Sequence, residues 1–400
     1  MKRRACLWIL ILATTQCWCA PRKITVAQLE EMLHSMQRDK RQDAEIATAL
    51  KQIELSQELT RKSMNSLVSY APGPLATEQI YVLEAKSANL VPPDADLPAT
   101  PAPNQAEQKA ILDKTSTYVT GTYAELPKLE ALKTTLRFQD NVEALAASSG
   151  LQGGARDVTV DAGFSNPANF VHYINSAQTQ VISNHGAEKL SPAKEKTQWG
   201  ANKMVAIEDP DPNLTTVFRA AESAQEIQWL RWQLINGKVT AVFSFDVPRK
   251  QSHFDVHVCC FPKVHQSGIA NFYTSTTAQT LNAGGGGAGG GVNGNFQTNT
   301  NWHDFKTTVP FHGQFYIDPQ TGTVLRMLVQ AELNPAELVH QLDTRIDFAP
   351  MKVRDKVYIL PVKTFVDSLV VPNGDSGAAT YSTRRTLFTS EYKDYEPNSN

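Results

Sequence analysis

The stretch "GQFYIDPQTGTVLRMLVQAEL" (313–333) decides the fold class, because it has the pattern of two strands joined by a tight turn. Phe315 and Ile317 stand two residues apart, so in a strand they share one face. In the turn "DPQTG", Pro319 presets its own φ and Gly322 supplies a left-handed position. The stretch therefore predicts an antiparallel β-hairpin.

The same pattern recurs on both sides of this hairpin. "EIQWLRWQLI" and "KVTAVFSFDV" are separated by Asn236-Gly237, which suits a type I′ turn because both positions need a positive φ. "TRIDFAPMKV" and "KVYILPV" are separated by Arg354-Asp355, and "SHFDVHVCCF" (252–261) is expected to pair back on 238–247. Further strands are expected at 129–138, 170–183 and 379–392. Repeated hairpins without intervening helices predict an antiparallel meander.

The residues before the meander predict helices. "ITVAQL" carries a helix start at Thr25 with Gln28 as its capping-box partner, and the apolar stripe Leu29, Met32, Leu33 and Met36 follows. After "QRDKRQD" a similar stripe continues to residue 53, so two amphipathic helices are expected within 24–68. The stripes fit either packing on the protein's own body or a coiled-coil dimer. Other helices are expected at 76–89 and 104–126.

The chain divides into a leader and two parts. "MKRR" followed by "ACLWILILATTQC" is typical of a secretory signal within residues 1–20, with cleavage before Ala20 or, alternatively, lipidation of Cys17. A helical segment (21–90), a Pro-rich linker (91–103) and a β domain (104–395) follow. A glycine-rich insertion, "AGGGGAGGGVNGN", interrupts the β domain at about 262–308. These features predict an exported protein of the periplasm or cell surface, with no transmembrane helix in the mature chain.

Composition excludes one class of partner. Of 400 residues, 41% are apolar and 20% charged, with a net charge of −2. Nucleic-acid binders carry a concentrated basic footprint, which this chain lacks, so no nucleic acid is expected. Three of the five cysteines lie in the leader. The other two, Cys259 and Cys260, point to opposite faces if the strand is extended, or form a vicinal disulfide if a turn precedes Pro262.

Candidate chemistry is sparse. His253, Asp255 and His257 alternate on one strand and share a face, which is a metal-binding pattern or simply the polar side of a half-exposed strand. Asp318 and Arg326 flank the "PQTG" turn, as a carboxylate–arginine site or as a turn cap with an outward arginine. No GxSxG, HExxH or phosphate-loop motif occurs, so neither an enzyme nor a cofactor is expected.

Long parts of the chain resemble known families. "WLRWQLINGKVTAVFSFDVPRKQSHFDVHVCC", "FHGQFYIDPQTGTVLRMLVQAEL" and "IDFAPMKVRDKVYILPV", together with the N-terminal helices, resemble a family of uncharacterised exported bacterial proteins. The pattern strand–"IDPQTG"–"VLR"–strand–"VYILPV" is similar to the periplasmic lipoprotein-carrier superfamily, which includes the outer-membrane lipoprotein-sorting proteins. That resemblance implies an open half-barrel, covered by helices, whose concave face holds acyl chains. It implies no catalytic residue.

The predicted fold is therefore α+β: N-terminal helices, then an antiparallel meander that forms an open half-barrel covered by helices. The first functional hypothesis is a non-enzymatic envelope protein that holds an acyl chain or another apolar ligand. The alternative is an assembly or sensor scaffold whose N-terminal helices contact a protein partner. Trp229 and Arg231 are expected to share a face. The candidate ligand-binding positions are Trp229, Arg231, Leu325, Met327, Val329 and Ile359.

Overall fold

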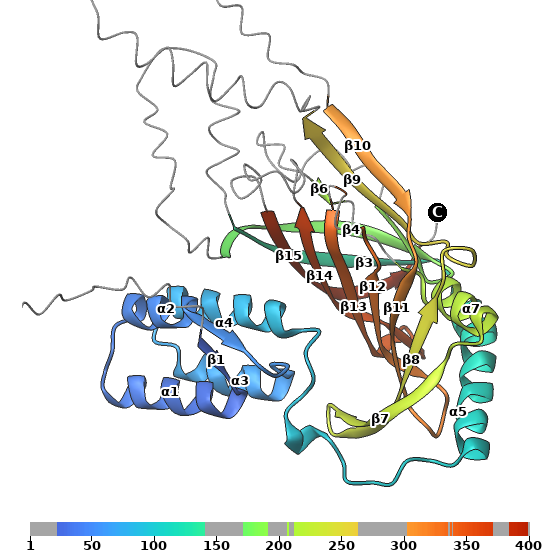
Figure 1. Cartoon of the computed structure of the whole chain (residues 1–400), viewed down its shortest axis with the longest axis horizontal. Coiled ribbons are helices and arrows are strands. Elements are labelled where there is room, and N and C mark those ends of the chain that lie inside the picture. The colour runs from blue at the N-terminus through green and yellow to red at the C-terminus, as the bar shows by residue number, and fades with distance from the viewer. Residues whose placement is uncertain are drawn as a thin grey trace, which may run out of the picture.

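The computed structural model describes residues 22–140, 171–190, 206–207, 212–262, 302–334, 337, 339–370 and 384–398. Its main element is a ten-stranded sheet in the order β5-β4-β3-β15-β14-β13-β12-β11-β8-β7, in which every neighbouring pair is antiparallel (Figure 1). Strands β5 and β7 form its two edges, so the sheet is open. The predicted α+β class with an open half-barrel is confirmed. The proposed leader lies outside the described residues.

Local signals placed most of these strands correctly. Asn236 and Gly237 have φ angles of 50° and 80°, as the type I′ turn between β7 and β8 requires. Gly322 has a φ of 73° in the β11–β12 turn, and Arg354 has 54° in the β13–β14 turn. The strands are β3 (Leu129–Gln139), β4 (His172–Asn184), β5 (Ala187–Leu190), β7 (Gln228–Ile235), β8 (Lys238–Val247), β11 (Phe311–Ile317), β12 (Val324–Ala331), β13 (Val339–Val353), β14 (Lys356–Val370) and β15 (Arg384–Pro397).

A second, smaller sheet has the order β10-β9-β6, formed by β10 (Trp302–Thr308), β9 (Asp255–Pro262) and β6 (Ala206–Ile207). The prediction that 252–261 pairs back on 238–247 is therefore wrong. Both sides of β8 are already occupied, by β7 and by β11. Because β10 is a strand, the expected glycine-rich insertion ends earlier than residue 308, and its residues 263–301 lie outside the described part.

The N-terminal residues form a separate helical unit, here called the helical unit. Its helices are α1 (Val26–Arg38), α2 (Asp43–Lys51), α3 (Arg61–Tyr70) and α4 (Pro74–Ser87), and β1 (Arg22–Ile24) pairs in parallel with β2 (Ile53–Leu55). The capping box of Thr25 and Gln28 is present in both directions, as predicted. The helical reading of residue 53 is wrong, because Ile53 begins β2 opposite Arg22.

The apolar stripes of α1 and α2 pack within this unit. Leu29, Leu33 and Ile46 are fully buried in one cluster that also contains side chains of α3 and α4. These positions are the ones that a coiled-coil dimer would have to present to a second chain. The stripes therefore serve the unit's own core.

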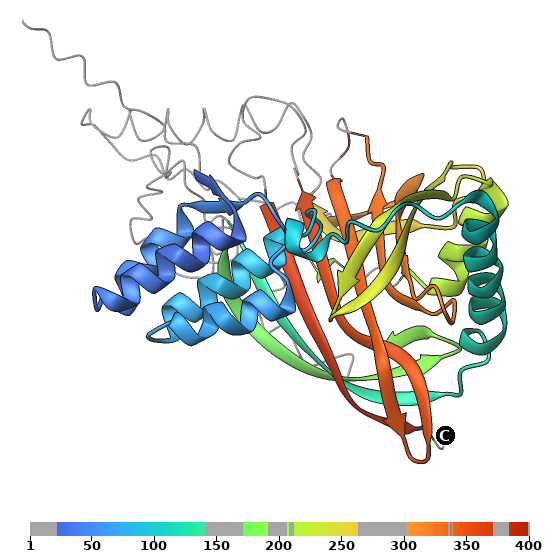
Figure 2. The same cartoon turned by 90° about the horizontal axis from the view of Figure 1, so that it is seen from below.

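Helices cover both faces of the large sheet. One face is covered by α5 (Gln105–Thr117), a π-helical segment (Tyr118–Tyr123) and α7 (Leu214–Ala224). These helices share one apolar cluster with residues of β3, β4, β8 and β11 to β15. This face is the inner face of the curved sheet. The helical unit contacts the opposite, outer face. Figures 1 and 2 show the two groups of helices on opposite sides of the strands.

The inner face is filled by aromatic side chains. Phe218 of α7 lies 5.3 Å from Phe315, and Phe315 lies 4.3 Å from Phe245, measured between ring centroids. Helix α7 was not predicted, although its start signal is present. The side chain of Asn213 accepts hydrogen bonds from two backbone N–H groups of the first turn, and apolar residues then recur at helical spacing.

The outer face joins the helical unit through an apolar patch and through charges. Val82 and Ala85 of α4 share a buried cluster with Phe365 and Leu387 of the sheet. The Pro-rich segment, with a short helix η1 (Asp94–Asp96), then crosses to β7, where Trp232 Nε1 donates a hydrogen bond of 2.8 Å to a backbone oxygen of that segment. None of the helices in the described part of the chain is long and apolar enough to cross a bilayer.

Candidate functional site

Four charged side chains meet where the helical unit contacts the outer face. Arg326 on β12 and Arg345 on β13 both bond Glu58, which follows β2, at 2.9 and 2.7 Å. The same two arginines bond Asp347 on β13, at 2.6 and 2.8 Å. Each carboxylate thus bridges both guanidinium groups. These four residues are called the junction charge cluster below.

The junction charge cluster is unusual because most of its charged side chains are buried. The side chains of Glu58, Arg345 and Arg326 are only 3%, 7% and 9% exposed. Burial alone would raise the pKa of Asp347, but the two arginines outweigh it and hold that pKa far below its usual range. Conversely, burial would lower the pKa of Arg345, and Asp347 with Glu58 raises it. Both groups are therefore charged at neutral pH.

One further ion pair and one hydrogen bond to a backbone oxygen extend the contact along the outer face. Lys363 on β14 bonds Glu84 of α4 at 2.7 Å, and Arg345 also donates to the backbone oxygen of Ala88 at 2.6 Å. Buried charges are costly unless they are paired, and their pairing is directional. The arrangement supplies neither an activated nucleophile nor a free general base. What it can do is hold the helical unit in one orientation on the sheet.

The low pKa of Asp347 makes stability depend on pH in the acid range. An unfolded aspartate titrates near pH ~3.9. Because the folded pKa is lower, the ionised carboxylate contributes stability that is present above that value and is lost as the pH falls toward the folded pKa. We expect the free energy of unfolding, measured in urea, to fall between about pH 5 and pH 3, less steeply in Asp347→Asn than in the wild type. If the free energy of unfolding fell equally steeply with pH in Asp347→Asn and in the wild type, the prediction would be contradicted.

The predicted ligand-binding residues do not converge on one site. Met327 and Val329 are fully buried in the inner core, while Trp229 and Ile359 pack at its edge and Leu325 is half-buried. Arg231 lies on the other face of the sheet, where it donates to Gln233, Gln314 and Tyr316.

The prediction that Trp229 and Arg231 share a face is wrong, because a β-bulge between them shifts the alternation by one residue. The bulge instead brings Trp232 to within 4.8 Å of Trp229, measured between ring centroids.

The turn at "PQTG" carries no site. Asp318 Oδ1 accepts a hydrogen bond of 2.9 Å from the backbone of Gln320, as expected of a turn cap. Arg326 does not point outward, as the alternative expected, but belongs to the junction charge cluster. The partner that buries it, Glu58, is 268 positions away in the sequence.

The predicted metal pattern is only partly described, and the prediction that all three residues lie on one strand is wrong, because His253 precedes β9. His253 is exposed, and Asp255 accepts a hydrogen bond from Thr308 of β10. The side chains of His257, Cys259 and Cys260 lie outside the described residues, so the predicted metal site and vicinal disulfide stay predictions. The described residues bring together a different potential metal-binding group, Asp246, His312 and Glu332. No sequence motif marks it, because its members come from three separate segments: β8, β11 and the residue directly after β12.

Two hollows in the described part of the chain are considered as ligand sites. One is an open hollow of about 560 Å³ on the helical unit, lined by Met36, Asp39, Arg41, Ala44, Glu45 and Thr48. The other is a small, partly open cavity of about 20 Å³ at the inner face, lined in part by Ile346, Thr364 and Tyr392. The second has room for about one water molecule and is too small for an acyl chain.

Comparison with known proteins gives a weak likeness. No protein-family model and no curated protein matches the chain. Among solved structures, a chain of the complex of MucA and MucB from Pseudomonas aeruginosa aligns with 10% identity and a TM-score of 0.19, over 74% of this chain and 100% of that one. A TM-score this low carries no argument about this chain. The resemblance to exported proteins and to lipoprotein carriers therefore stays a prediction.

Proposed function

We propose that the chain is a non-enzymatic scaffold of the cell envelope, in which the helical unit contacts a protein partner and the half-barrel holds that unit in place. The junction charge cluster carries this proposal. It joins two parts that have separate apolar cores through buried, directional ion pairs. An arrangement of this kind is suited to presenting one surface in a fixed orientation.

The surface favoured for the partner is the open hollow between α1 and α2. Its lining combines half-buried Met36 with the charged side chains of Asp39, Arg41 and Glu45. Methionine and arginine are enriched at protein interfaces, and Asp39 and Glu45 suit the polar rim that surrounds such a contact. Figure 1 shows the connection between α1 and α2 at the end of the helical unit that is farthest from the sheet. A partner bound there would not be obstructed by the half-barrel.

The other hypothesis, an acyl-chain carrier, requires a hollow inner face. In the described part of the sheet that face is filled by Phe218, Phe243 and Phe315, each at most 1% exposed. This favours the scaffold role. Lipid extraction and mass spectrometry of the purified protein separate the two: an acyl ligand at one equivalent per chain would count for the carrier and against the scaffold.

Site-specific crosslinking in the cells that make the protein tests the scaffold role. A photo-crosslinking amino acid replaces Thr48 in the hollow or, as the control, Val357 at the exposed β13–β14 turn. We expect a discrete protein adduct from position 48 only, and its loss when Arg41→Glu reverses a charge in the hollow. The same adduct from both positions, or none from position 48, would contradict the proposal.

A further inference from the structure

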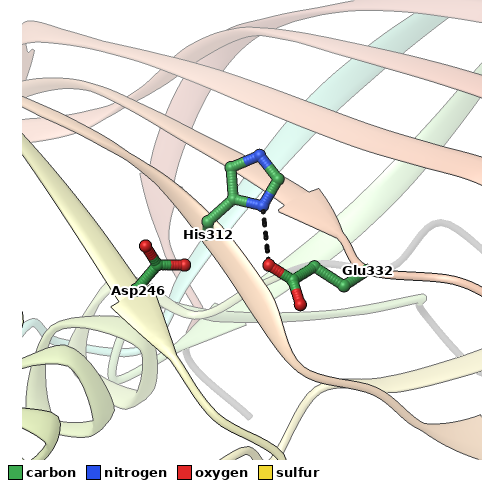
Figure 3. A group of neighbouring side chains, drawn as sticks. All are labelled: Asp246, His312 and Glu332. Atoms are coloured by element: carbon green, nitrogen blue, oxygen red, sulfur yellow. Dashed lines mark ion pairs between the residues drawn. The ribbon is translucent and has the colours of Figure 1, made fainter.

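A separate group of polar side chains lies on the β8–β11–β12 part of the sheet. Asp246 on β8, His312 on β11 and Glu332 directly after β12 each offer one ligand atom, and these atoms all lie within 4.8 Å of one another (Figure 3). We propose that these three side chains bind a divalent transition-metal cation. This inference is independent of the proposed function, because it uses none of the residues of the junction charge cluster or of the α1–α2 hollow.

Strand pairing fixes the backbone of all three residues. His312 is paired directly with Asp246 across β8 and β11. The backbone N–H of Glu332 donates to the oxygen of Pro310 at 2.8 Å, which extends the β11–β12 ladder by one step. Alternation places all three on the outer face, because Phe311 and Phe245 beside them point into the inner core. Strand pairing therefore fixes the backbone positions of the three residues before any ion binds.

The separation of the ligand atoms fits a metal centre. His312 Nδ1 lies 3.3 Å from Glu332 Oε1. In a tetrahedral centre with bonds of about 2.0–2.1 Å, two ligand atoms are about 3.3–3.4 Å apart. Asp246 is exposed, so its side chain is free to rotate in order to complete the set. Figure 3 shows the three labelled side chains as neighbours, with the ion pair joining His312 to Glu332.

Charge also favours a cation at this place. Two carboxylates converge on one imidazole, which carries at most a single positive charge. A divalent cation bound by neutral His312 and two ionised carboxylates is balanced in charge. A plain ion pair between His312 and Glu332 leaves the charge of Asp246 uncompensated within the group.

The donor set selects the class of ion. An imidazole nitrogen suits zinc and other first-row transition metals, whereas calcium and magnesium prefer sites made of oxygen ligands only. Three protein ligands at an exposed site leave at least one coordination position for water. The structure therefore assigns an open, surface-accessible site rather than a closed structural one.

Calorimetric titration of the full chain with Zn²⁺ tests the assignment. We expect one equivalent to bind with an affinity in the micromolar range. His312→Asn, Asp246→Asn and Glu332→Gln are each expected to weaken it by at least about 10- to 100-fold, the loss seen even for groups that only support a ligand. The matched control is His253→Asn, which removes an exposed histidine of the other predicted metal pattern and should leave the affinity unchanged.

Three results would overturn the site. They are no binding below millimolar Zn²⁺, unchanged affinity in His312→Asn, and loss of binding in His253→Asn. Co²⁺ provides a second measurement, because its visible absorption reports ligand number and geometry. A tetrahedral spectrum in the wild type that is absent in Glu332→Gln supports the site, and an unchanged spectrum in that variant counts against it. Circular dichroism confirms that each variant is folded.

Discussion

Replacing Arg345 with alanine should lower the free energy of unfolding by about 3–5 kcal/mol, the cost of removing one partner from a buried ion pair. Arg345 bonds Glu58 at 2.7 Å and Asp347 at 2.8 Å and also donates to the oxygen of Ala88. Without it, the buried Glu58 and the partly buried Asp347 are left with only Arg326 between them. Replacing Arg345 with lysine instead should restore little of this free energy, since an ammonium group cannot reproduce the planar set of donors that spans both carboxylates.

Urea unfolding at neutral pH measures this loss, and Lys393→Ala is the matched control. Lys393 belongs to an ion pair on the same sheet, but its side chain is 67% exposed. An exposed pair contributes at most about 1 kcal/mol, so the control should unfold almost as the wild type does. If Arg345→Ala lost no more than the control, the junction charge cluster would not hold the two parts together.

Gly313→Ala should be at least as damaging as a large core truncation, although it adds a single methyl group. A Cβ at position 313 would lie 1.9 Å from the backbone oxygen of Leu328 and 2.6 Å from Phe245 Cζ. The oxygen belongs to the neighbouring strand, so it cannot move without displacing the β11–β12 pairing. We expect a loss of about 3 kcal/mol or more, the upper end of the cost of overpacking.

The same substitution at Gly121 is the control for this prediction. Gly121 lies in the π-helical segment, and nothing lies within 4 Å of the position that its Cβ would take. Alanine is the better helix former by about 1 kcal/mol, so Gly121→Ala should be neutral or stabilising. Thermal unfolding of both variants distinguishes them. A melting temperature for Gly313→Ala equal to that of the wild type would mean that the two strands are not as close as described.

The elements that sequence predicted well are those encoded locally. Asn236-Gly237 specifies its own turn, and Thr25 with Gln28 specifies its own helix start, so neither depends on distant parts of the chain. The alternation of "GQFYI" likewise identified a strand. Alternation cannot tell, however, what covers the inner face of that strand, because Phe218 of α7, which packs on Phe315, comes from far away in the sequence.

The wrong predictions from sequence share one cause, which is that contacts with distant parts of the chain decide these features. Arg326 follows a turn, which favours an exposed side chain, and it is buried because it pairs with Glu58 of the helical unit and with Asp347 of β13. The bulge in β7 reversed the faces of Trp229 and Arg231 because register depends on the partner strand as well as on the strand's own sequence. The group formed by Asp246, His312 and Glu332 exists only after three strands have paired.

The position of β15 has a consequence for how the chain is made. This strand follows all the others in sequence, yet it lies inside the sheet, between β3 and β14. While the protein is being synthesised, one edge of β3 has no partner strand until residues 384–397 are made, roughly 10–50 s later at about 5–20 residues per second. During that interval β3 keeps an open edge, and unpaired edges promote aggregation. Efficient production should therefore depend on a chaperone that shields nascent strands.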